Sequence, residues 1–358
     1  MCIRDSINAS LPDQADPSRT LNKMLMPGPN KLPQIMKLVL ATTLKKCIAM
    51  VDIKKMFLAV QLQKLSDRDM LRFVWAEAGK PAPDFYRFKT LPFGVVSSPF
   101  QAIWCLQEAA QQQKREYPEA AEIILTMTYM DDIVIVAESV EMTVKLLKEV
   151  LHILDVGGFY GHKISASDPQ VLESLGKDRT DTARVVKILG LILDHDSGNF
   201  RFNVDEIFSH FMESPKKVTR HLLVSLAARV FDTQGYVSPY VMQFKKLLPM
   251  LWQNNTAWKE DLETRTTVDD LGNKVLCPVA QEAVSKFREW VSDIPRLKAL
   301  QFPRFIGGPI QFVAIFGDAS KTGIGVVAYA VTKADNGCLL YTSPSPRDLS
   351  TSRMPSSA

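Results

Sequence analysis

The stretch TMTYMDDIVIVAES, residues 126–139, places two adjacent carboxylates inside a strongly apolar, β-branched run. Such a run is typical of a buried strand, and a buried strand excludes a pair of uncompensated charges. Two strands joined by a tight turn remove the conflict, because Asp tolerates turn geometry and a hairpin tip is open to solvent. The sequence therefore predicts strands within 122–130 and 133–137, with Asp131 and Asp132 at the tip between them.

Asp52 also ends an apolar run, KCIAMVDI at residues 46–53, so it can lie at the same end of a shared sheet. Adjacent carboxylates repel and raise each other's pKa, and a bound divalent cation removes this conflict. An isolated Asp-Asp pair is more often an exposed acidic turn, but a third carboxylate favours a site for two Mg²⁺ ions, which prefer oxygen ligands. Two such ions about 4 Å apart activate a hydroxyl and stabilise a leaving pyrophosphate. The carboxylates therefore indicate nucleotidyl transfer.

The rest of the composition excludes several other classes of protein. The chain has 358 residues and a formal charge of +4, which is compatible with a polyanionic partner without demonstrating one. No apolar run approaches the roughly 20 residues of a membrane span, and no signal peptide is recognisable. The cysteines lack CxxC spacing and the histidines lack paired metal-ligand spacing, so neither a zinc module nor a disulfide framework is indicated. A reduced setting fits the scattered cysteines best. The cysteines are Cys2, Cys47, Cys105, Cys277 and Cys338, and the histidines are His152, His162, His195, His210 and His221.

Both ends of the chain are polar and rich in proline or serine, so residues 1–19 and 336–358 are predicted to be poorly ordered. Natural disordered tails are one explanation. The letters MCIRDS and LLYTSPSPRD, however, look like translated sequencing adapters, so we expect a reading frame that is cut at both ends.

Between the ends, hydrophobic periodicity predicts alternating helices and strands. Helices are expected over 97–117, where Ser98 is the candidate N-cap and Pro99 the first helical residue, over 139–158, and within 214–290. Residues 186–202 are expected to form two strands around a Ser-Gly turn, and residues 310–331 a hairpin around Lys-Thr-Gly. The letters DSG at 196–198 match an aspartic-protease triad, but their place in a turn favours the turn.

Five motifs give the chain a specific resemblance over residues 20–193. They are VDIKKMF at 51–57, LPFGVVSSPFQA at 91–102, YMDD at 129–132, GGFYGHK at 157–163 and VKILGLIL at 186–193. Their order and spacing resemble the consecutive motifs of reverse transcriptases. The last of them resembles the primer-grip hairpin of that family, although an ordinary core hairpin has the same pattern.

The resemblance implies a role for each matching residue. Asp52, Asp131 and Asp132 match the catalytic carboxylates, and the main-chain carbonyl of Ile53 is expected to join them around two Mg²⁺ ions, for which Mn²⁺ can substitute. Tyr129, together with Met130 of the same YMDD motif, is expected to contact the nucleic acid.

Further roles implied by the resemblance concern the incoming nucleotide. Phe57 matches the aromatic residue under the sugar, which excludes a 2′-hydroxyl, although core packing is the simpler explanation for an isolated Phe. Phe93 and Gly94 belong to the loop that contacts template and nucleotide; Phe93 stands where some retroviral enzymes carry Gln. Lys163 matches the lysine that neutralises or protonates the leaving pyrophosphate, but as an isolated residue it would pass for a surface lysine.

Nucleic-acid contacts outside these motifs are less specific. Arg68 and Arg72 follow the first motif and can contact the phosphate backbone, and a solvated surface explains them equally well. The basic strand pair that in this family precedes the LNKMLMPGP segment is not found. Catalytic competence of the chain therefore stays open at this stage.

The segments outside the catalytic motifs resemble the Pao/BEL group of long-terminal-repeat retrotransposons, with a Ty3-like or retroviral origin second. They include LNKMLMPGP, DRDMLRFVW and ARVFDTQGYVSP; the last reads Thr233-Gln234 where the group has Pro-Leu. FGDASKTGIGVVAYA then resembles the first hairpin of a ribonuclease H domain, and Asp318 matches its first metal ligand. The pattern ends near Lys333, so a working nuclease is not expected from this chain.

The fold class implied is α+β, a right-hand polymerase with partial fingers, a palm with an antiparallel sheet and a helical thumb or connection, followed by the first hairpin of a ribonuclease H-like α/β domain. The expected boundaries are 20–205 for fingers and palm, 206–305 for the thumb or connection and 306–335 for the ribonuclease H start.

The function implied is that of an RNA-directed DNA polymerase fragment of a retrotransposon Pol polyprotein. Its expected partners are an RNA/DNA template-primer, a dNTP and other polyprotein segments, with no membrane, and its expected location is a cytoplasmic retroelement particle. Two alternatives remain open: an inactive remnant that retains nucleic-acid binding, and a DNA-templated palm polymerase.

Overall fold

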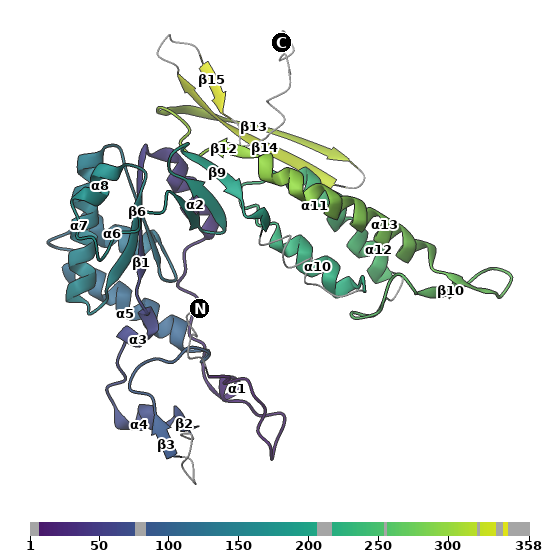
Figure 1. The fold of residues 1–358 in the computed structure, drawn as a ribbon, viewed down its shortest axis with the longest axis horizontal. Coiled ribbons are helices and arrows are strands. Elements are labelled where there is room, and N and C mark those ends of the chain that lie inside the picture. The colour runs from purple at the N-terminus through teal and green to yellow at the C-terminus, as the bar shows by residue number, and fades with distance from the viewer. Residues whose placement is uncertain are drawn as a thin grey trace. The chain divides into compact units, whose positions relative to one another are not determined.

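The computed structural model describes residues 7–75, 84–205, 217–253, 256–320, 323–333 and 339–342 (Figure 1). The chain divides into two compact units, Met1–Ala183 and Arg184–Ala358. Strands and helices are mixed in both units, which confirms the predicted α+β class. The described part contains no helix with the length and apolar content needed to cross a bilayer.

The first unit is built on a four-stranded antiparallel sheet in the order β4-β5-β1-β6. These strands are β1 (Cys47–Ile53), β4 (Thr128–Tyr129), β5 (Asp132–Ala137) and β6 (Gly161–Ala166). Helices α5 (Ser98–Gln113), α6 (Pro118–Thr126) and α7 (Val140–Val156) pack together on one side of the sheet (Figure 1). The shared core contains alternate residues of three strands, among them Val51, Ile53, Ile133, Ile135 and Ile164. Because strand side chains alternate between faces, Asp52 and Asp132 lie on the opposite face. His162 is paired with Asp52 and lies on that face too, because a register shift in the β1–β6 ladder interrupts the alternation before Ile164.

The helices that flank the hairpin begin and end at recognisable signals. In α7 the hydroxyl of Ser139 accepts a hydrogen bond from the backbone N–H of Met142, and Gly158 follows the helix with a φ of 77°, which confirms the predicted helix. In α5 the predicted N-cap is wrong. Ser98 is the first helical residue, after Ser97, and its hydroxyl donates to the Pro92 carbonyl oxygen at 2.8 Å.

The predicted strand over residues 122–130 is also wrong. Helix α6 occupies Pro118–Thr126, and β4 retains only Thr128–Tyr129. Pro118 lies in the first turn of the helix, where its missing N–H costs nothing, and Ala120, Ala121 and Ile124 are buried at helical spacing. Packing against α5 and α7 therefore outweighs the β-branched composition of the segment.

Shorter elements complete the first unit. The two-stranded hairpin of β2 (Arg72–Trp75) and β3 (Asp84–Arg87) lies apart from the main sheet (Figure 1). The helices are α1 (Leu21–Met24), α2 (Ile35–Leu44), α3 (Met56–Ala59), α4 (Leu65–Asp69) and α8 (Pro169–Glu173).

The N-terminal segment differs from its prediction. Poor order is expected for residues 1–19, of which 1–6 lie outside the described residues. The backbone N–H of Ile7 donates to the Phe93 carbonyl oxygen at 3.1 Å, and Ala9 is only 7% exposed. Ile7 and Ala9 are therefore packed, and the exposed residues that follow them are joined by turn hydrogen bonds such as Asp13 N–H to the Arg19 carbonyl oxygen.

The second unit begins with a sheet in the order β12-β9-β8-β7. Its strands are β7 (Val185–Ile188), β8 (Leu191–Asp194), β9 (Asn199–Phe202) and β12 (Gln301–Pro303). Three strands, where two are predicted, thus fill residues 185–202. The missed turn is Leu189-Gly190, a two-residue loop with φ of 48° and 89°, which is the primed hairpin geometry. The Ser-Gly turn between β8 and β9 is confirmed, with Gly198 at a φ of 68°.

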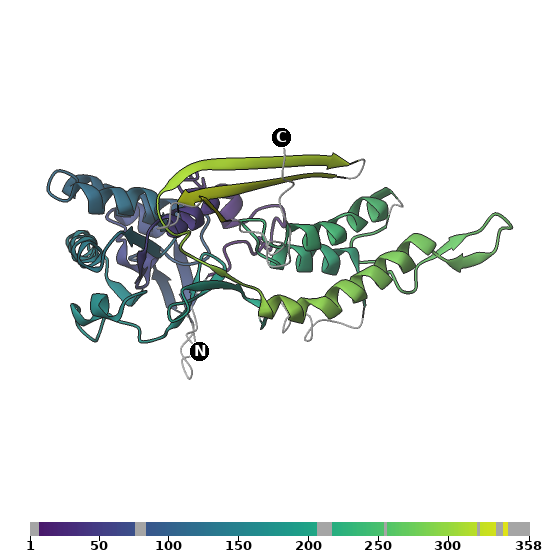
Figure 2. The same cartoon turned by 90° about the horizontal axis from the view of Figure 1, so that it is seen from above.

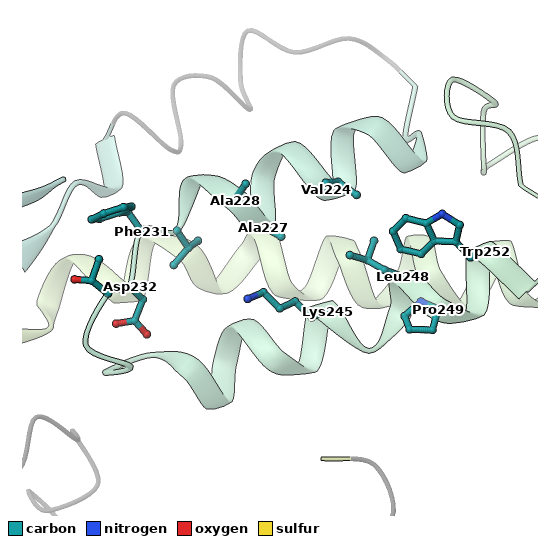
Figure 3. Close-up of a pocket in the computed structure, with 11 residues that line it drawn as sticks. Val224, Ala227, Ala228, Phe231, Asp232, Lys245, Leu248, Pro249 and Trp252 are labelled. Atoms are coloured by element: carbon teal, nitrogen blue, oxygen red, sulfur yellow. The ribbon is translucent and has the colours of Figure 1, made fainter. Parts of the chain in front are cut away.

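Helices dominate the middle of the second unit. They are α10 (Arg220–Arg229), α11 (Ser238–Lys245), α12 (Leu247–Gln253), α13 (Pro278–Asp293) and the 3₁₀ helix η1 (Ile294–Ala299), with a small hairpin of β10 (Thr266–Val268) and β11 (Lys274–Leu276). A groove of about 570 Å³ runs between α10 and α11–α12 (Figure 3). Leu248 and Trp252 form much of its wall, with Lys245 and Asp232 as its charged residues.

The last described elements are β13 (Ile310–Ser320), β14 (Gly323–Lys333) and β15 (Leu339–Thr342). The first two form the predicted hairpin and lie side by side in both views (Figure 2). Two residues of its predicted turn, Lys321 and Thr322, lie outside the described residues.

The turn at Gly190 provides a test of the second unit. A Cβ added to Gly190 would lie 2.3 Å from Cδ1 of Phe231, and its φ of 89° disfavours any other residue. We expect Gly190→Ala to lower the free energy of unfolding by about 2–4 kcal/mol, because backbone strain and a steric clash act together.

Gly198→Ala is the matched control for this substitution. Gly198 has a similar φ of 68°, but nothing lies within 4 Å of its added Cβ, so only the conformational cost of about 1–2 kcal/mol is expected. Urea unfolding followed by circular dichroism measures both values. Equal losses in the two variants would contradict the clash with Phe231.

Candidate active site

The three predicted carboxylates meet because β1 lies between β5 and β6. In the antiparallel register Asp52 of β1 is directly opposite Asp132 of β5, and on its other side it is opposite His162 of β6. Directly opposed residues in an antiparallel pair place their side chains on the same face, about 5 Å apart at Cβ. Strand pairing therefore brings together Asp52 and Asp132, which are distant in sequence.

Asp131 occupies the tip of the β4–β5 hairpin, as predicted, whereas Asp132, which is also predicted at the tip, is the first residue of β5. Tyr129 pairs with Asp132, so Met130 and Asp131 form a two-residue loop. Met130 has a φ of 56°, a left-handed conformation that costs of order 1–3 kcal/mol for a residue other than glycine. The backbone N–H of Ile53 donates to the Asp131 carbonyl oxygen at 2.7 Å, which ties the tip to the end of β1.

The carboxylates disturb one another electrostatically. Burial, followed by the neighbouring charges of Asp131 and Asp52, raises the pKa of Asp132 to about 6, and Lys163 opposes this shift. The protein thus holds three acidic groups close enough for their charges to interact. Such an arrangement lowers the stability of the free protein and is typical of a functional site.

Two residues of β6 face Asp52. His162 Nε2 lies 2.6 Å from Asp52 Oδ1, and Lys163 Nζ lies 3.7 Å from Asp52 Oδ2. Lys163 has a φ of 47°, and the ladder between β1 and β6 is irregular between Met50 and Asp52. This irregular local geometry allows two successive residues of β6 to approach the same carboxylate. The sequence predicts Lys163 but not His162, whose only signal is its position beside Lys163.

The predicted nucleotide contacts form a second group. Phe57 belongs to the four-residue helix α3, which begins after Lys55 in a left-handed conformation with a φ of 50°. Its ring packs on Phe93, with 4.9 Å between ring centroids and 36° between ring planes. The structure therefore brings Phe57 and Phe93 together.

The loop that carries Phe93 is fixed by residues the sequence did not indicate. Asn22 Nδ2 donates to the Gly94 carbonyl oxygen at 3.0 Å, and Asn22 Oδ1 accepts from the Val96 N–H at 2.8 Å. Gly94 has a φ of 92°, and a Cβ at this position would lie 2.0 Å from the Ile7 carbonyl oxygen. Only glycine permits this approach of the N-terminal segment.

The remaining predicted residues lie outside these two groups. Arg68 Nε donates to the Leu62 carbonyl oxygen at 2.6 Å, and Arg72 pairs with Asp69 at 3.2 Å. Asp318 is an exposed residue of β13 opposite Gly325. The phosphate and metal roles of these three residues stay predictions.

A divalent cation fits the donor set. Among the described residues, no three His, Cys, Asp or Glu side chains already form a metal-coordinating cluster. The carboxylates are nevertheless hard oxygen donors, and burial and neighbouring charges disfavour the ionised form of Asp132. A bound cation would stabilise that ionised form, so Asp52, Asp131 and Asp132 suit the ion chemically.

Comparison with known families gives this geometry a context. The model described as "Reverse transcriptase (RNA-dependent DNA polymerase)" matches residues 14–193. The chain belongs to the reverse transcriptase family. A second model, "Pao retrotransposon-like RNaseH-like domain", matches residues 219–342, which confirms a Pao-type arrangement. This reverse transcriptase thus carries its carboxylates inside the matched polymerase domain, and the Pao match spans both the helices from α10 onward and the β13–β14 hairpin.

Two solved structures are similar in fold. The foamy viral protease-reverse transcriptase dRH in complex with double-stranded DNA has a TM-score of 0.52 and 15% identity, covering 91% of this chain and 48% of that one. A second foamy viral protease-reverse transcriptase, also with double-stranded DNA, has a TM-score of 0.51 and 16% identity, covering 87% and 54%. The chain therefore spans about half the length of these proteins. A search of curated protein sequences finds no match.

The pKa of Asp132 predicts a specific dependence of stability on pH. A carboxyl with a folded pKa near 6 and an unfolded value of 3.8 binds more protons in the folded state, so its contribution to stability falls as the pH rises from about 4 to about 6. In metal-free buffer we expect Asp132→Asn to be more stable than the parent above pH 6, by about 1–2 kcal/mol after allowance for solvent screening. This difference should shrink toward zero near pH 4.

Urea unfolding in EDTA at pH 5.0 and pH 7.5 measures the effect. Asp205→Asn is the control, because that side chain is 79% exposed and forms a surface ion pair with Lys298. A stabilisation of Asp132→Asn that is the same at both pH values would contradict the electrostatic origin.

Proposed function

We propose that this reverse transcriptase adds deoxynucleotides to a primer 3′-OH on an RNA template, as part of a retrotransposon Pol polyprotein. The observation that carries the proposal is the register that sets Asp52 opposite Asp132, next to Asp131, inside the domain that the reverse transcriptase family matches. Three convergent carboxylates on one sheet face suit the transfer of a nucleotidyl group.

The carboxylates are the proposed metal ligands. Asp52, Asp131 and Asp132, with the carbonyl oxygen of Ile53, would hold two Mg²⁺ ions, or Mn²⁺ in their place. When bound, these ions lower the pKa of the attacking hydroxyl and stabilise charge on the leaving pyrophosphate. His162, at 2.6 Å from Asp52 Oδ1, limits the orientations open to that carboxylate.

Lys163 and Phe57 are proposed to act on the nucleotide. The Lys163 side chain is 63% exposed with its Nζ 3.7 Å from Asp52, so it can place a positive charge or a proton beside the leaving group. Phe57, held by Phe93, is proposed to lie under the sugar and to exclude a 2′-hydroxyl by steric overlap.

A template-primer duplex and a dNTP are the proposed ligands. The similar foamy viral proteins were solved with double-stranded DNA, which supports a duplex as the partner. Other segments of the Pol polyprotein are proposed as further partners, and a cytoplasmic retroelement particle is proposed as the location. Both proposals rest on the Pao-type family match alone.

Primer extension tests the reaction. With an RNA template, a DNA primer, dNTPs and Mg²⁺, we expect incorporation by the parent chain and a loss of roughly 100-fold or more in Asp131→Asn, because a metal ligand contributes several kcal/mol to the transition state. Asp205→Asn, a surface substitution, should retain the parent rate. Retained primer-template binding without incorporation by the parent would instead favour the non-catalytic remnant, and incorporation on DNA but not RNA templates would favour a DNA-templated polymerase.

The role of Phe57 gives a separate prediction. Phe57→Ala removes the ring under the sugar, so the ratio of kcat/KM for dATP to that for ATP should fall by roughly tenfold or more. Single-nucleotide insertion kinetics measure the ratio. An unchanged ratio with reduced kcat for both nucleotides would assign Phe57 to packing.

A further inference from the structure

We propose that Phe93 is a positioning residue that fixes the ring of Phe57 and thereby sets how strictly the chain selects the sugar of the incoming nucleotide. The inference rests on the proposed function, since it assumes that Phe57 meets the sugar. It assigns to the loop of Phe93 and to the N-terminal segment a specificity role that their sequence does not indicate.

The local structure around Phe57 does not hold its ring by itself. Helix α3 has only four residues, and it follows a left-handed Lys55. Its hydrogen bonds, such as Leu58 N–H to the Lys55 carbonyl oxygen at 2.8 Å, fix the backbone, and the side chain of Phe57 packs against the main core of the unit. The side chain is only partly buried there, so a ring that must exclude one hydroxyl needs a further neighbour that restricts its torsions. Phe93, with its ring centroid 4.9 Å away, is in contact with the Phe57 ring.

Phe93 is suited to positioning and not to direct polar recognition. Its side chain has no donor or acceptor, so it acts on its surroundings through shape and packing. The two rings are tilted by 36°, within the range in which aromatic pairs attract one another beyond the area they bury. A change at Phe93 should therefore reach the nucleotide through Phe57.

The backbone of Phe93 is held by the N-terminal segment. The Ile7 N–H donates to the Phe93 carbonyl oxygen at 3.1 Å, and the Asn22 amide bonds to both Gly94 and Val96, at 3.0 and 2.8 Å. The same Asn22 amide nitrogen lies 3.0 Å from the Ser10 hydroxyl. Asn22 thus connects the segment before it with the loop of Phe93.

A small apolar core reinforces this connection. Ala9, Leu71 and Val95 are buried together, and Ile7 packs against them. Because the Ile7 carbonyl oxygen would lie 2.0 Å from any Cβ at Gly94, segment and loop are in direct contact. The loop that carries Phe93 is therefore held by both polar and apolar contacts with the N-terminal segment.

Single-nucleotide insertion by the full chain tests the inference, with dATP and ATP on an RNA template. Phe93→Leu should lower the dATP-to-ATP ratio of kcat/KM by roughly 3- to 10-fold, the factor that the packing of one aromatic pair permits. Phe93→Tyr keeps the ring and should retain the parent ratio. In the Phe57→Ala background Phe93→Leu should change the ratio no further, because the residue through which it acts is gone.

Two further variants sharpen the test. Asn22→Ala removes the polar anchor of the loop and should lower the ratio in the same direction as Phe93→Leu, by a smaller factor. Phe316→Leu is the control, because it removes one ring of a different aromatic pair, with Tyr329 at 5.7 Å in the β13–β14 hairpin of the second unit. It should retain the parent ratio. If Phe93→Leu loses its circular-dichroism signal, Phe93→Met replaces it, because the unbranched methionine side chain adapts to an irregular gap.

The outcomes separate the inference from the function it rests on. The inference would be overturned if the dATP-to-ATP ratio of kcat/KM fell in Phe57→Ala but stayed at the parent value in Phe93→Leu. That result would leave the proposed function intact. Equal losses of kcat/KM for both nucleotides in Phe93→Leu would also overturn it, because a merely structural role predicts that pattern. No incorporation by the parent chain would overturn the proposed function and the inference with it.

Discussion

The antiparallel pairing of β1 with β5 is the constraint on which the site depends. Its register sets Asp52 opposite Asp132, and a shift of one residue in either strand would turn the carboxylate of that strand into the core beside α5, α6 and α7. Burying an uncompensated carboxylate is among the largest single costs a fold can incur. The apolar residues on the core face, Val51, Ile53 and Ile133, are at most 1% exposed, so the same packing that stabilises the sheet also fixes which face carries the acids.

The repulsion among the carboxylates on the other face of the sheet destabilises the fold, but it favours the binding of a cation. Asp132 is driven toward its protonated form by burial and by two neighbouring carboxylates, while Lys163 partly offsets them. His162 and Lys163 both approach Asp52, so a histidine and one positively charged lysine from β6 meet the acids of β1 and β5. The site therefore contains more negative charge than the protein compensates by itself, which is the condition that favours a bound cation.

Much of this site is predictable from the sequence because local sequence patterns indicate it. The acids interrupt apolar runs, helix α7 has its cap and its terminal glycine, and the long hairpin of β13 and β14 has its turn residues. Helix α6 was missed because its β-branched residues resemble a strand and only packing against α5 and α7 decides between the two. His162 and Asn22 were missed for a different reason: their partners lie far away along the chain, and a single sequence carries no record of such pairs.

The two halves of the site are consequently built in different ways. The carboxylates are placed by strand register, which many core residues enforce together, so no single neighbour determines their position. Phe57 and Phe93 are placed by a four-residue helix, a loop and one asparagine, together with the packing of Phe57 against the core. No strand register enforces the contact between the two rings, so a single substitution can alter it. Nucleotide selection can therefore vary through substitutions around Asn22 and Phe93 that leave the carboxylates, and the chemistry they support, in place.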